Sequence, residues 1–277
     1  MPLPRFLRRF DNTNMRLRII SSVILVPCVL FAVWVGGIVY GAMIAATMML
    51  GLYEWLNMVT PQARPQTIGS AFSLMLFMMA GGLLFSVAFG ALLGVVSTMI
   101  LFVLFVHDND DRAGWAALGI PYMGGSGLAL LALRAIPGYG MHYVFYLLAT
   151  VWATDVGAFI AGRIIGGPKL APFISPGKTW AGLAGGVVLA TICGYFTTVF
   201  LGARNPSLAL FLSPLLAIMA QGGDLFESYF KRRAGLKESG DIIPGHGGIL
   251  DRIDGLVVAG IFAYLFQSAL GEKIFFW

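Results

Sequence analysis

The sequence predicts an all-α fold class, namely a polytopic integral membrane protein with about nine transmembrane helices. Composition favours this class, because hydrophobic residues make up 58% of the 277 residues, charged residues make up 11%, and the mean hydropathy is +0.84. These values lie far outside the range of soluble domains. Between Ile19 and Val106 the only charged residues are Glu54 and Arg64. Because one span needs about 20 apolar residues, several spans fit into that segment.

Glycine pairs, prolines and clusters of charge divide the apolar sequence into these spans. The weakest boundary is Gly36-Gly37, where two separate helices compete with one long tilted helix or a re-entrant pair. We expect a basic cytoplasmic tail over 1–18, N-terminal transmembrane spans over 19–141 and a C-terminal catalytic transmembrane region over 142–277. The predicted spans are 19–36, 38–56, 67–88, 90–106, 114–134, 142–163, 179–202, 206–227 and 250–271.

Arginines are concentrated before the first span, and the positive-inside rule therefore places the N-terminus in the cytoplasm. With nine spans, most loops that carry Lys or Arg then face the same side. The formal net charge of +5 comes mostly from this tail, which we interpret as a topology signal and an anchor for lipid headgroups. We expect contact with membrane lipid, no nucleic-acid partner, and a location in a bacterial inner (plasma) membrane. The arginines are Arg5, Arg8, Arg9, Arg16 and Arg18.

A first polar constellation begins inside the sixth predicted span. Asp155 lies there at a depth where a carboxylate costs about 2.5 to 3.5 kcal/mol, so it should face a polar cavity, a cation or a base, unless it is tied to a neighbouring helix. Ser175 is a good N-cap and Pro176 a good first residue for the seventh span. The free amides of that helix start, with Lys178 in its first turn, would bind an anion. A nucleotide P-loop is excluded, because Pro172 stands where that motif needs Gly.

A second constellation runs from Asp224 to Asp254 and holds six of the 13 acids and five of the 18 Lys and Arg residues. If the eighth span continues as a helix, it presents a polar stripe on one face. Asp251 and Asp254 lie three residues apart on the ninth span, and a glycine-rich turn returns the chain beside the eighth. Carboxylates from two helices are therefore expected to converge. The stripe on the eighth span consists of Asp224, Glu227, Ser228 and Lys231.

Converging carboxylates with nearby bases are typical of a site for Mg²⁺ and phosphate, because Mg²⁺ commonly bridges carboxylates to substrate phosphates. We expect Asp224 and Asp251 to hold Mg²⁺, with Asp254 in support and with room for a second metal ion. Gly247 and Gly248 would expose backbone amides in a tight turn. A plain salt-bridged loop is the alternative, but such a loop does not need this turn. The bases that would neutralise phosphate oxygens are Lys231, Arg232, Lys237 and Arg252.

Both constellations also contain longer motifs. The second reads Ser228-x-Phe230-Lys231-Arg232, Lys237, Pro244-Gly-His246-Gly-Gly248 and Asp251-Arg252-Ile-Asp254, and the first reads Thr154-Asp155-x-Gly157-Ala158, Ala161-Gly162-Arg163, Lys169-Leu-Ala-Pro172 and Ile174-Ser-Pro-x-Lys178-Thr-Trp180. Together they resemble the signature of the phosphatidate cytidylyltransferases over about the C-terminal half. Three positions depart from the family pattern. They are Glu238, where the signature has Asp, and Gly177 and Ala181, to which we assign no role.

The resemblance implies transfer of a cytidylyl group from CTP to phosphatidic acid, which yields CDP-diacylglycerol and pyrophosphate in a Mg²⁺-dependent reaction. The charged loops would then be cytoplasmic catalytic loops. The residues expected to act in the reaction are Asp224, Asp251, Lys178, Lys231 and Arg252. The residues expected to bind substrate, with their division between CTP and lipid left open, are Asp155, Ser175, Ser228, Arg232, Lys237, His246, Gly247 and Gly248.

Two other functions remain open from the residues alone. One is a CTP-dependent enzyme that acts on another lipid, such as a polyprenol kinase or an archaeal-type lipid cytidylyltransferase. The other is an ion-coupled transporter, whose intramembrane acids would bind cations. A transporter predicts inverted repeats, and the first half of the chain contains no convincing copy of either constellation. Helix faces rich in small residues are compatible with a homodimer.

Overall fold

The computed structural model describes residues 12–243, 245 and 247–270, and side chains over 20–269 of these ranges. His246, Pro244 and most of the basic tail therefore lie outside the described residues. The elements are α1 (Asn12–Val35), α2 (Gly37–Val59), α3 (Pro65–Leu84), α4 (Val87–His107), α5 (Ala113–Ala117), η2 (Ile120–Gly124), α6 (Gly125–Ala135), α7 (Gly140–Ile164), β1 (Lys169–Ala171), β2 (Ser175–Thr179), α8 (Trp180–Phe200), η3 (Pro206–Leu208), α9 (Ala209–Arg233) and α10 (Leu250–Leu270).

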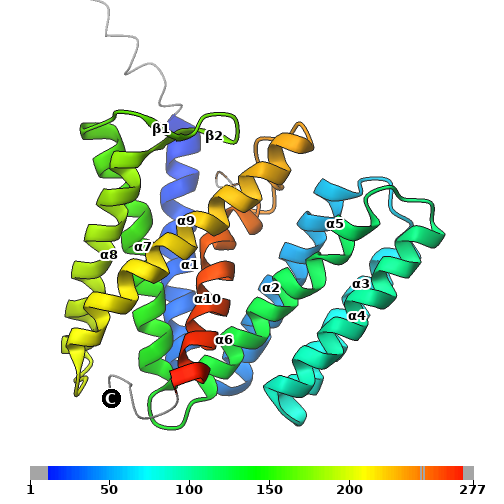
Figure 1. Cartoon of the computed structure of the whole chain (residues 1–277), viewed down its shortest axis with the longest axis horizontal. Helices are drawn as coiled ribbons and strands as arrows, with labels where there is room; N and C mark the ends of the chain where they lie inside the picture. Colours follow the sequence, from blue (N-terminus) through cyan, green and yellow to red (C-terminus); the bar gives the residue numbers. More distant parts are fainter. Residues whose placement is uncertain (1–11, 244, 246, 271–277) are drawn as a thin grey trace, which may run out of the picture.

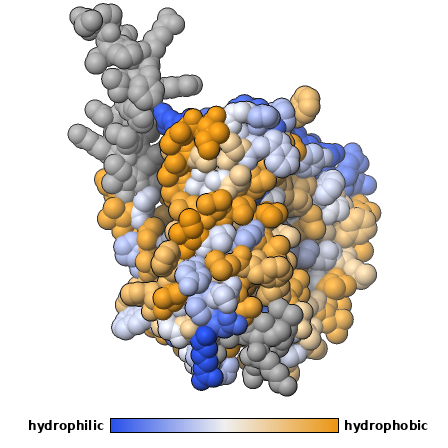
Figure 2. Space-filling view, turned by 60° about the vertical axis from the view of Figure 1, so that its left-hand side comes forward, coloured by the Kyte–Doolittle hydropathy of each residue, from blue (hydrophilic) through white to orange (hydrophobic). Residues whose placement is uncertain are grey.

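The predicted all-α class is confirmed. Within the described residues, eight helical segments are long and apolar enough to cross a membrane, and the Ile20–Val35 part of α1 is a shorter apolar helix. The predicted spans fall one by one on these segments, with α5, η2 and α6 together forming the segment Ala113–Ala135. Large apolar side chains face outward, as at Ile38, which is 90% exposed. Figure 2 shows hydrophobic residues over much of the visible face, as expected for a surface in contact with lipid.

The uncertain boundary at Gly36-Gly37 is a break between two helices. Gly36 has φ 69° and ψ −152°, a backbone conformation that is essentially restricted to glycine. The Arg134 side chain donates from Nε to the Val33 carbonyl at 2.7 Å and from Nη2 to the Trp34 carbonyl at 3.3 Å, which satisfies carbonyls at the end of α1. In Figure 1, α1 and α2 approach each other at the lower end of the bundle and separate toward the upper end.

Glycines allow α7 and α8 to pack with their backbones close together. A Cβ atom on Gly157 would lie 2.5 Å from the Gly185 carbonyl oxygen, and one on Gly186 would lie 2.9 Å from the Thr154 carbonyl oxygen. Gly182 and Gly186 of α8 are both buried in this interface. This close packing fixes the position of the polar end of α7 beside the start of α8.

The connection between α7 and α8 corrects the predicted start of the seventh span. Ser175 and Pro176 do not begin a helix, because Ser175–Thr179 forms strand β2 and pairs antiparallel with β1, with Ala171 opposite Ser175. The N-cap of α8 is Thr179, whose Oγ1 accepts a hydrogen bond from the Gly182 amide at 3.0 Å. Lys178 consequently lies in a hairpin strand and not in the first helical turn.

Helices α9 and α10 cross with almost no space between them. A Cβ atom on Gly223 would lie 2.4 Å from the Asp254 carbonyl oxygen, and one on Gly255 would lie 3.1 Å from the Ala220 carbonyl oxygen. Helix α9 continues to Arg233, as the sequence predicts for its polar stripe. Figure 1 shows the β1–β2 hairpin, the end of α9 and the start of α10 at the same upper end of the bundle as the start of α1.

A buried aromatic cluster joins the N-terminal and C-terminal helices in one core. Trp55 of α2 lies 4.7 Å from Phe230 and 6.0 Å from Phe226, both on α9, measured between ring centroids. Tyr122 of η2 lies 5.2 Å from Trp55 and 5.2 Å from Phe226. The polar end of α9 is therefore supported by residues from the first half of the chain.

Candidate functional site

A charged cavity of about 530 Å³ lies between α7, β2, the start of α8, α9 and the start of α10. Both constellations identified in the sequence contribute to its wall, so segments about 70 residues apart along the chain converge there. Acids and bases are almost balanced. The acids on the wall are Asp155, Asp224, Glu238, Asp251 and Asp254, and the bases are Lys178, Lys231, Lys237 and Arg252.

The β1–β2 hairpin places Lys178 against α9. Its Nζ lies 2.7 Å from Asp224 Oδ2 and donates to the Gln221 carbonyl at 3.4 Å. Near the turn of the hairpin, Arg232 Nε donates to the Ile174 carbonyl at 3.2 Å. The hairpin is thus attached to α9 at two points, and these contacts hold Lys178 at the cavity.

The polar stripe of α9 faces the site as the helical spacing predicts. Ser228 Oγ donates to Asp224 Oδ1 at 3.1 Å, so Ser228 supports a residue of the cavity wall without lining the wall itself. One turn further on, Lys231 forms an ion pair with Glu227, which is fully buried. Glu227 Oε1 has no hydrogen-bond partner among the described residues.

Lys231 also joins α9 to α10. Its Nζ lies 2.6 Å from Asp251 Oδ1, while Asp251 Oδ2 accepts hydrogen bonds from the Ser239 amide at 2.9 Å and the Gly248 amide at 3.0 Å. Both oxygens of Asp251 therefore have partners within the protein. The carboxylate holds together the end of α9, the start of α10 and the connection between them.

The glycine-rich turn has a structural role in addition to the one predicted from its sequence. Gly247 has φ 78°, a left-handed conformation that favours glycine. Its carbonyl accepts a hydrogen bond from the Ile243 amide at 2.9 Å, and the Gly248 amide is used by Asp251. Four of the predicted substrate-binding residues, like Ser228, stand away from the cavity wall. They are Ser175, Arg232, Gly247 and Gly248.

The donor atoms around the cavity fit a hard divalent cation, although the structure does not gather a ready-made cluster. Among the described residues, no group of three or more His, Cys, Asp or Glu side chains is arranged to hold a metal ion. Asp224 and Asp251 are paired with lysines. Asp254 accepts a bond from the Gly255 amide at 2.7 Å, and Asp155 has no hydrogen bond or ion pair to another described residue. The carboxylates of Asp155, Asp224 and Asp254 line the same cavity, and oxygen donors of this kind suit a divalent cation.

The sequence interpretation missed the partners of Glu54, a buried carboxylate of α2 that is 1% exposed. It accepts hydrogen bonds from Ser239 Oγ at 3.0 Å, the Ile249 amide at 2.9 Å and the Leu250 amide at 2.8 Å. Glu54 thus reaches the connection that carries the glycine-rich turn. The signal was present, because it is the only acid between Ile19 and Val106 and an intramembrane acid indicates a functional partner.

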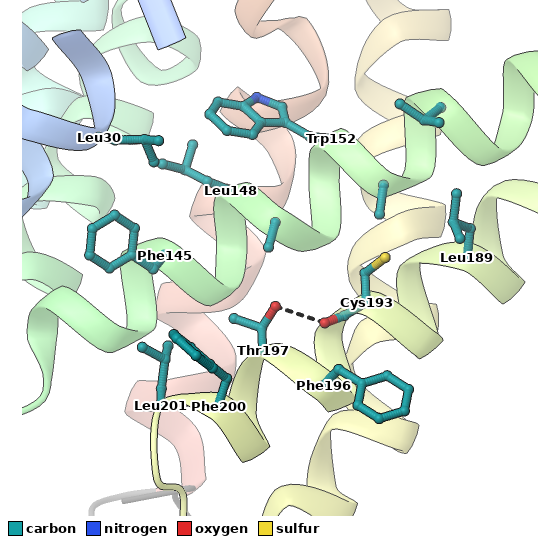
Figure 3. A pocket seen from close by; sticks show the side chains of 13 residues that line it. Leu30, Phe145, Leu148, Trp152, Leu189, Cys193, Phe196, Thr197, Phe200 and Leu201 are labelled. Atoms are coloured by element: carbon teal, nitrogen blue, oxygen red, sulfur yellow. Dashed lines mark hydrogen bonds between the residues drawn. The ribbon is translucent and has the colours of Figure 1, made fainter. Parts of the chain in front are cut away.

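A second hollow, of about 830 Å³, has an apolar lining, in contrast to the charged cavity. Figure 3 shows its lining by apolar side chains such as Leu30 of α1, Trp152 of α7 and Phe196 of α8. The hydroxyl of Thr197, which is part of the lining, donates to the Cys193 carbonyl at 2.7 Å. Among the described residues that line it, none is charged, so we interpret this hollow as a surface for lipid and not as a site for a charged substrate.

Comparison with known proteins shows to which protein family this chain belongs. Residues 16–270 match the pattern that defines the Cytidylyltransferase family, which is nearly the whole chain. The chain belongs to the cytidylyltransferase family. It is therefore an enzyme of the nucleotidyltransferase class and an integral membrane protein, and the resemblance identified from the motifs is confirmed.

Relatives of this cytidylyltransferase carry a common name. A protein of Brucella suis, named phosphatidate cytidylyltransferase, is 38% identical over 261 residues, which cover 94% of this chain and 96% of the relative. A protein of Bacillus subtilis with the same name is 34% identical over 261 residues, which cover 91% of this chain and 97% of the relative. In Haemophilus influenzae, a protein of this name is 41% identical over 140 residues, about half of each chain. These similarities do not favour a transporter.

Proposed function

We propose that this cytidylyltransferase transfers the cytidylyl group of CTP to phosphatidic acid and forms CDP-diacylglycerol and pyrophosphate. The names of relatives that match nearly the full chain support this substrate pair. The structural observation that carries the proposal is the charged cavity at the ends of apolar helices. A water-soluble triphosphate and a lipid headgroup can meet only at such a boundary between water and hydrocarbon.

The cavity suits phosphoryl chemistry without a protein nucleophile. A phosphate oxygen of phosphatidic acid attacks the α-phosphorus of CTP, the new P–O bond forms, and the bond to the β-phosphate breaks to release pyrophosphate. Catalysis of such a transfer depends mostly on positioning and on neutralisation of charge. We assign these tasks to Lys178, Lys231 and Arg252, with Lys237 as a further phosphate contact at the cavity wall.

A divalent cation completes the proposal, and we expect it to be Mg²⁺. The proposed ligands are Asp224, Asp251 and Asp254, which all line the cavity on the closely crossing helices α9 and α10. Asp251 remains in the proposed ligand set but also positions Lys231 and the connection to α10. Asp155 borders the same space from α7. When bound, the cation supplies a positive charge that neutralises phosphate oxygens.

The proposed orientation places the cavity at the cytoplasmic face of a bacterial inner membrane. Its support is the excess of Lys and Arg in the loops at the end of the bundle where α1 begins. CTP would arrive from the cytoplasm, while the acyl chains of phosphatidic acid stay in lipid. A homodimer stays a prediction, which crosslinking of the protein in native membranes would test.

Product analysis tests the proposed function. Purified protein in lipid vesicles is incubated with CTP labelled in the cytosine, phosphatidic acid and Mg²⁺. We expect a labelled CDP-lipid and pyrophosphate, and no product when EDTA removes the cation. Labelled CDP together with a newly phosphorylated lipid would instead identify a lipid kinase. A CDP-lipid formed only from a lipid other than phosphatidic acid would contradict the proposed acceptor.

A further inference from the structure

Glu54 is a buried carboxylate to which the proposed chemistry assigns no role. It lies on α2 in the N-terminal half, is almost completely buried, and forms no ion pair with a described base. All three of its hydrogen bonds come from the segment between Ser239 and Leu250. Burial of a carboxylate costs several kcal/mol unless hydrogen bonds compensate it, so this contact is a specific one.

Two of these bonds cap α10 from a distance. The first amides of a helix have no partners within the helix and are normally satisfied by a side chain just before it. Gly248 and Ile249 precede α10 and have no side-chain oxygen that could cap it. Glu54 acts as the cap instead and accepts hydrogen bonds from the Ile249 and Leu250 amides. A negative charge is also favourable at this end of a helix.

Ser239 connects Glu54 with the cavity. Its hydroxyl donates to Glu54 Oε2, and its amide donates to Asp251 Oδ2. Asp251 in turn binds the Gly248 amide and the Lys231 ammonium group. The two carboxylates therefore hold both ends of the connection, one end at Ser239 and the other at the start of α10.

The glycines of the connection leave space for Glu54. A Cβ atom on Gly240 would lie 2.8 Å from Glu54 Oε1, and one on Gly248 would lie 2.5 Å from Glu54 Oε2. Neither distance is possible for a real Cβ atom without movement. The second glycine of the turn is thus explained by the approach of a residue almost 200 positions earlier in the chain.

We propose that Glu54 is a positioning residue of the active site. It does not line the cavity and acts through the connection between α9 and α10, which it fixes so that Asp251 meets Lys231 and the next turn of α10 presents Asp254. The proposal rests on the proposed function for its kinetic part. Its structural part concerns the amides of Ser239, Ile249 and Leu250 and can be measured without any substrate.

The test compares Glu54→Gln and Glu54→Asp with Tyr40→Phe. The amide of Gln keeps one acceptor but presents an NH₂ group to a backbone donor, whereas the shorter Asp keeps the charge and should restore part of the function. Tyr40 is a matched control, because it is also buried on α2 and donates a long-range hydrogen bond, to the Leu130 carbonyl at 3.2 Å, away from the cavity.

We expect Glu54→Gln to lower kcat by about 10- to 100-fold, the range found for residues that orient ligands, with a smaller change in KM for CTP. Hydrogen exchange of the three amides should become faster in this variant and stay unchanged in Tyr40→Phe. A wild-type kcat with wild-type exchange, or an equal loss of kcat in Tyr40→Phe, would overturn the proposal.

If Glu54→Gln does not fold, Ser239→Ala provides the test, because it removes one bond to Glu54 and leaves the amide bond to Asp251. We expect kcat to be about 10-fold lower. We also expect hydrogen exchange of the Ser239 amide to become faster. Unchanged values of both would refute the role of Glu54. Wild-type protein that makes no CDP-lipid while Glu54→Gln still accelerates exchange would refute the proposed function and leave the positioning role standing.

Discussion

Removal of the Lys231 ammonium group tests the buried charge network most directly. Lys231→Met keeps an unbranched apolar side chain one atom shorter than that of Lys, but Glu227 and Asp251 lose the cation that both of them contact. The exposed fractions of these side chains are 10% for Lys231, 0% for Glu227 and 6% for Asp251. Breaking a pair buried to this degree costs about 3–5 kcal/mol, because a charge remains without compensation.

A loss of this size should be visible in thermal unfolding of the protein in detergent. At about 2–4 °C per kcal/mol, which applies to chains somewhat shorter than this one, the midpoint should fall by roughly 6–20 °C. Turnover should also fall by about 100-fold or more, because the variant lacks a positive charge that would neutralise the transferred phosphate. For the unfolding midpoint, Lys237→Met is the matched control, since Lys237 lines the same cavity but has no ion pair among the described residues.

A double variant separates stability from chemistry. Lys231→Met with Glu227→Gln removes one of the two carboxylates that lose their cation, the fully buried one, and should recover part of the unfolding midpoint, with the coupling given by a double-mutant cycle. Turnover should stay low. The reasoning is refuted if Lys231→Met unfolds at the wild-type temperature, or if the double variant regains wild-type turnover.

Three further variants test other parts of the structure. Asp224→Asn should lower Mg²⁺-dependent turnover by about 100-fold or more, and ordinary turnover across a Mg²⁺ titration would contradict the metal assignment. Gly248→Ala brings a Cβ atom to 2.1 Å from Ser239 Oγ and should lower the stability measured by thermal unfolding by about 1–3 kcal/mol. Gly36→Ala should cost a similar amount, because its backbone conformation is restricted to glycine. For both glycine variants Gly69→Ala is the control, since a Cβ atom there meets nothing within 4 Å, and an equal loss in the control would remove the structural explanation.

Hydropathy, together with the glycine pairs, prolines and charge clusters that divide the apolar sequence, predicted the membrane-spanning helices, because each needs a long apolar segment whatever its neighbours are. The break at Gly36 could not be decided in this way, since a glycine pair is compatible with two separate helices as well as with one long tilted helix or a re-entrant pair. The contact of Arg134 with the end of α1, about 100 residues away in sequence, settles the geometry. Such a contact has no local signal.

In the candidate site, too, local features could be predicted from the sequence and contacts between distant residues could not. The stripe from Asp224 to Lys231 followed from helical spacing, which is a local property. The start of α8 did not follow, because pairing of Ser175–Thr179 with Lys169–Ala171 overrides the preference of Ser-Pro for a helix start. The partners of Glu54 are 185 to 196 residues away, and only the folded chain reveals them.

The lysine–carboxylate pairs around the cavity have a consequence for ligand exchange. Lys178 pairs with Asp224, and Lys231 pairs with Asp251. A polyanion that binds these ammonium groups would compete with the two carboxylates, and Asp224 and Asp251 would then be free to hold a divalent cation. We therefore expect the binding of the nucleotide and the binding of the cation to favour each other, because each releases groups that the other binds.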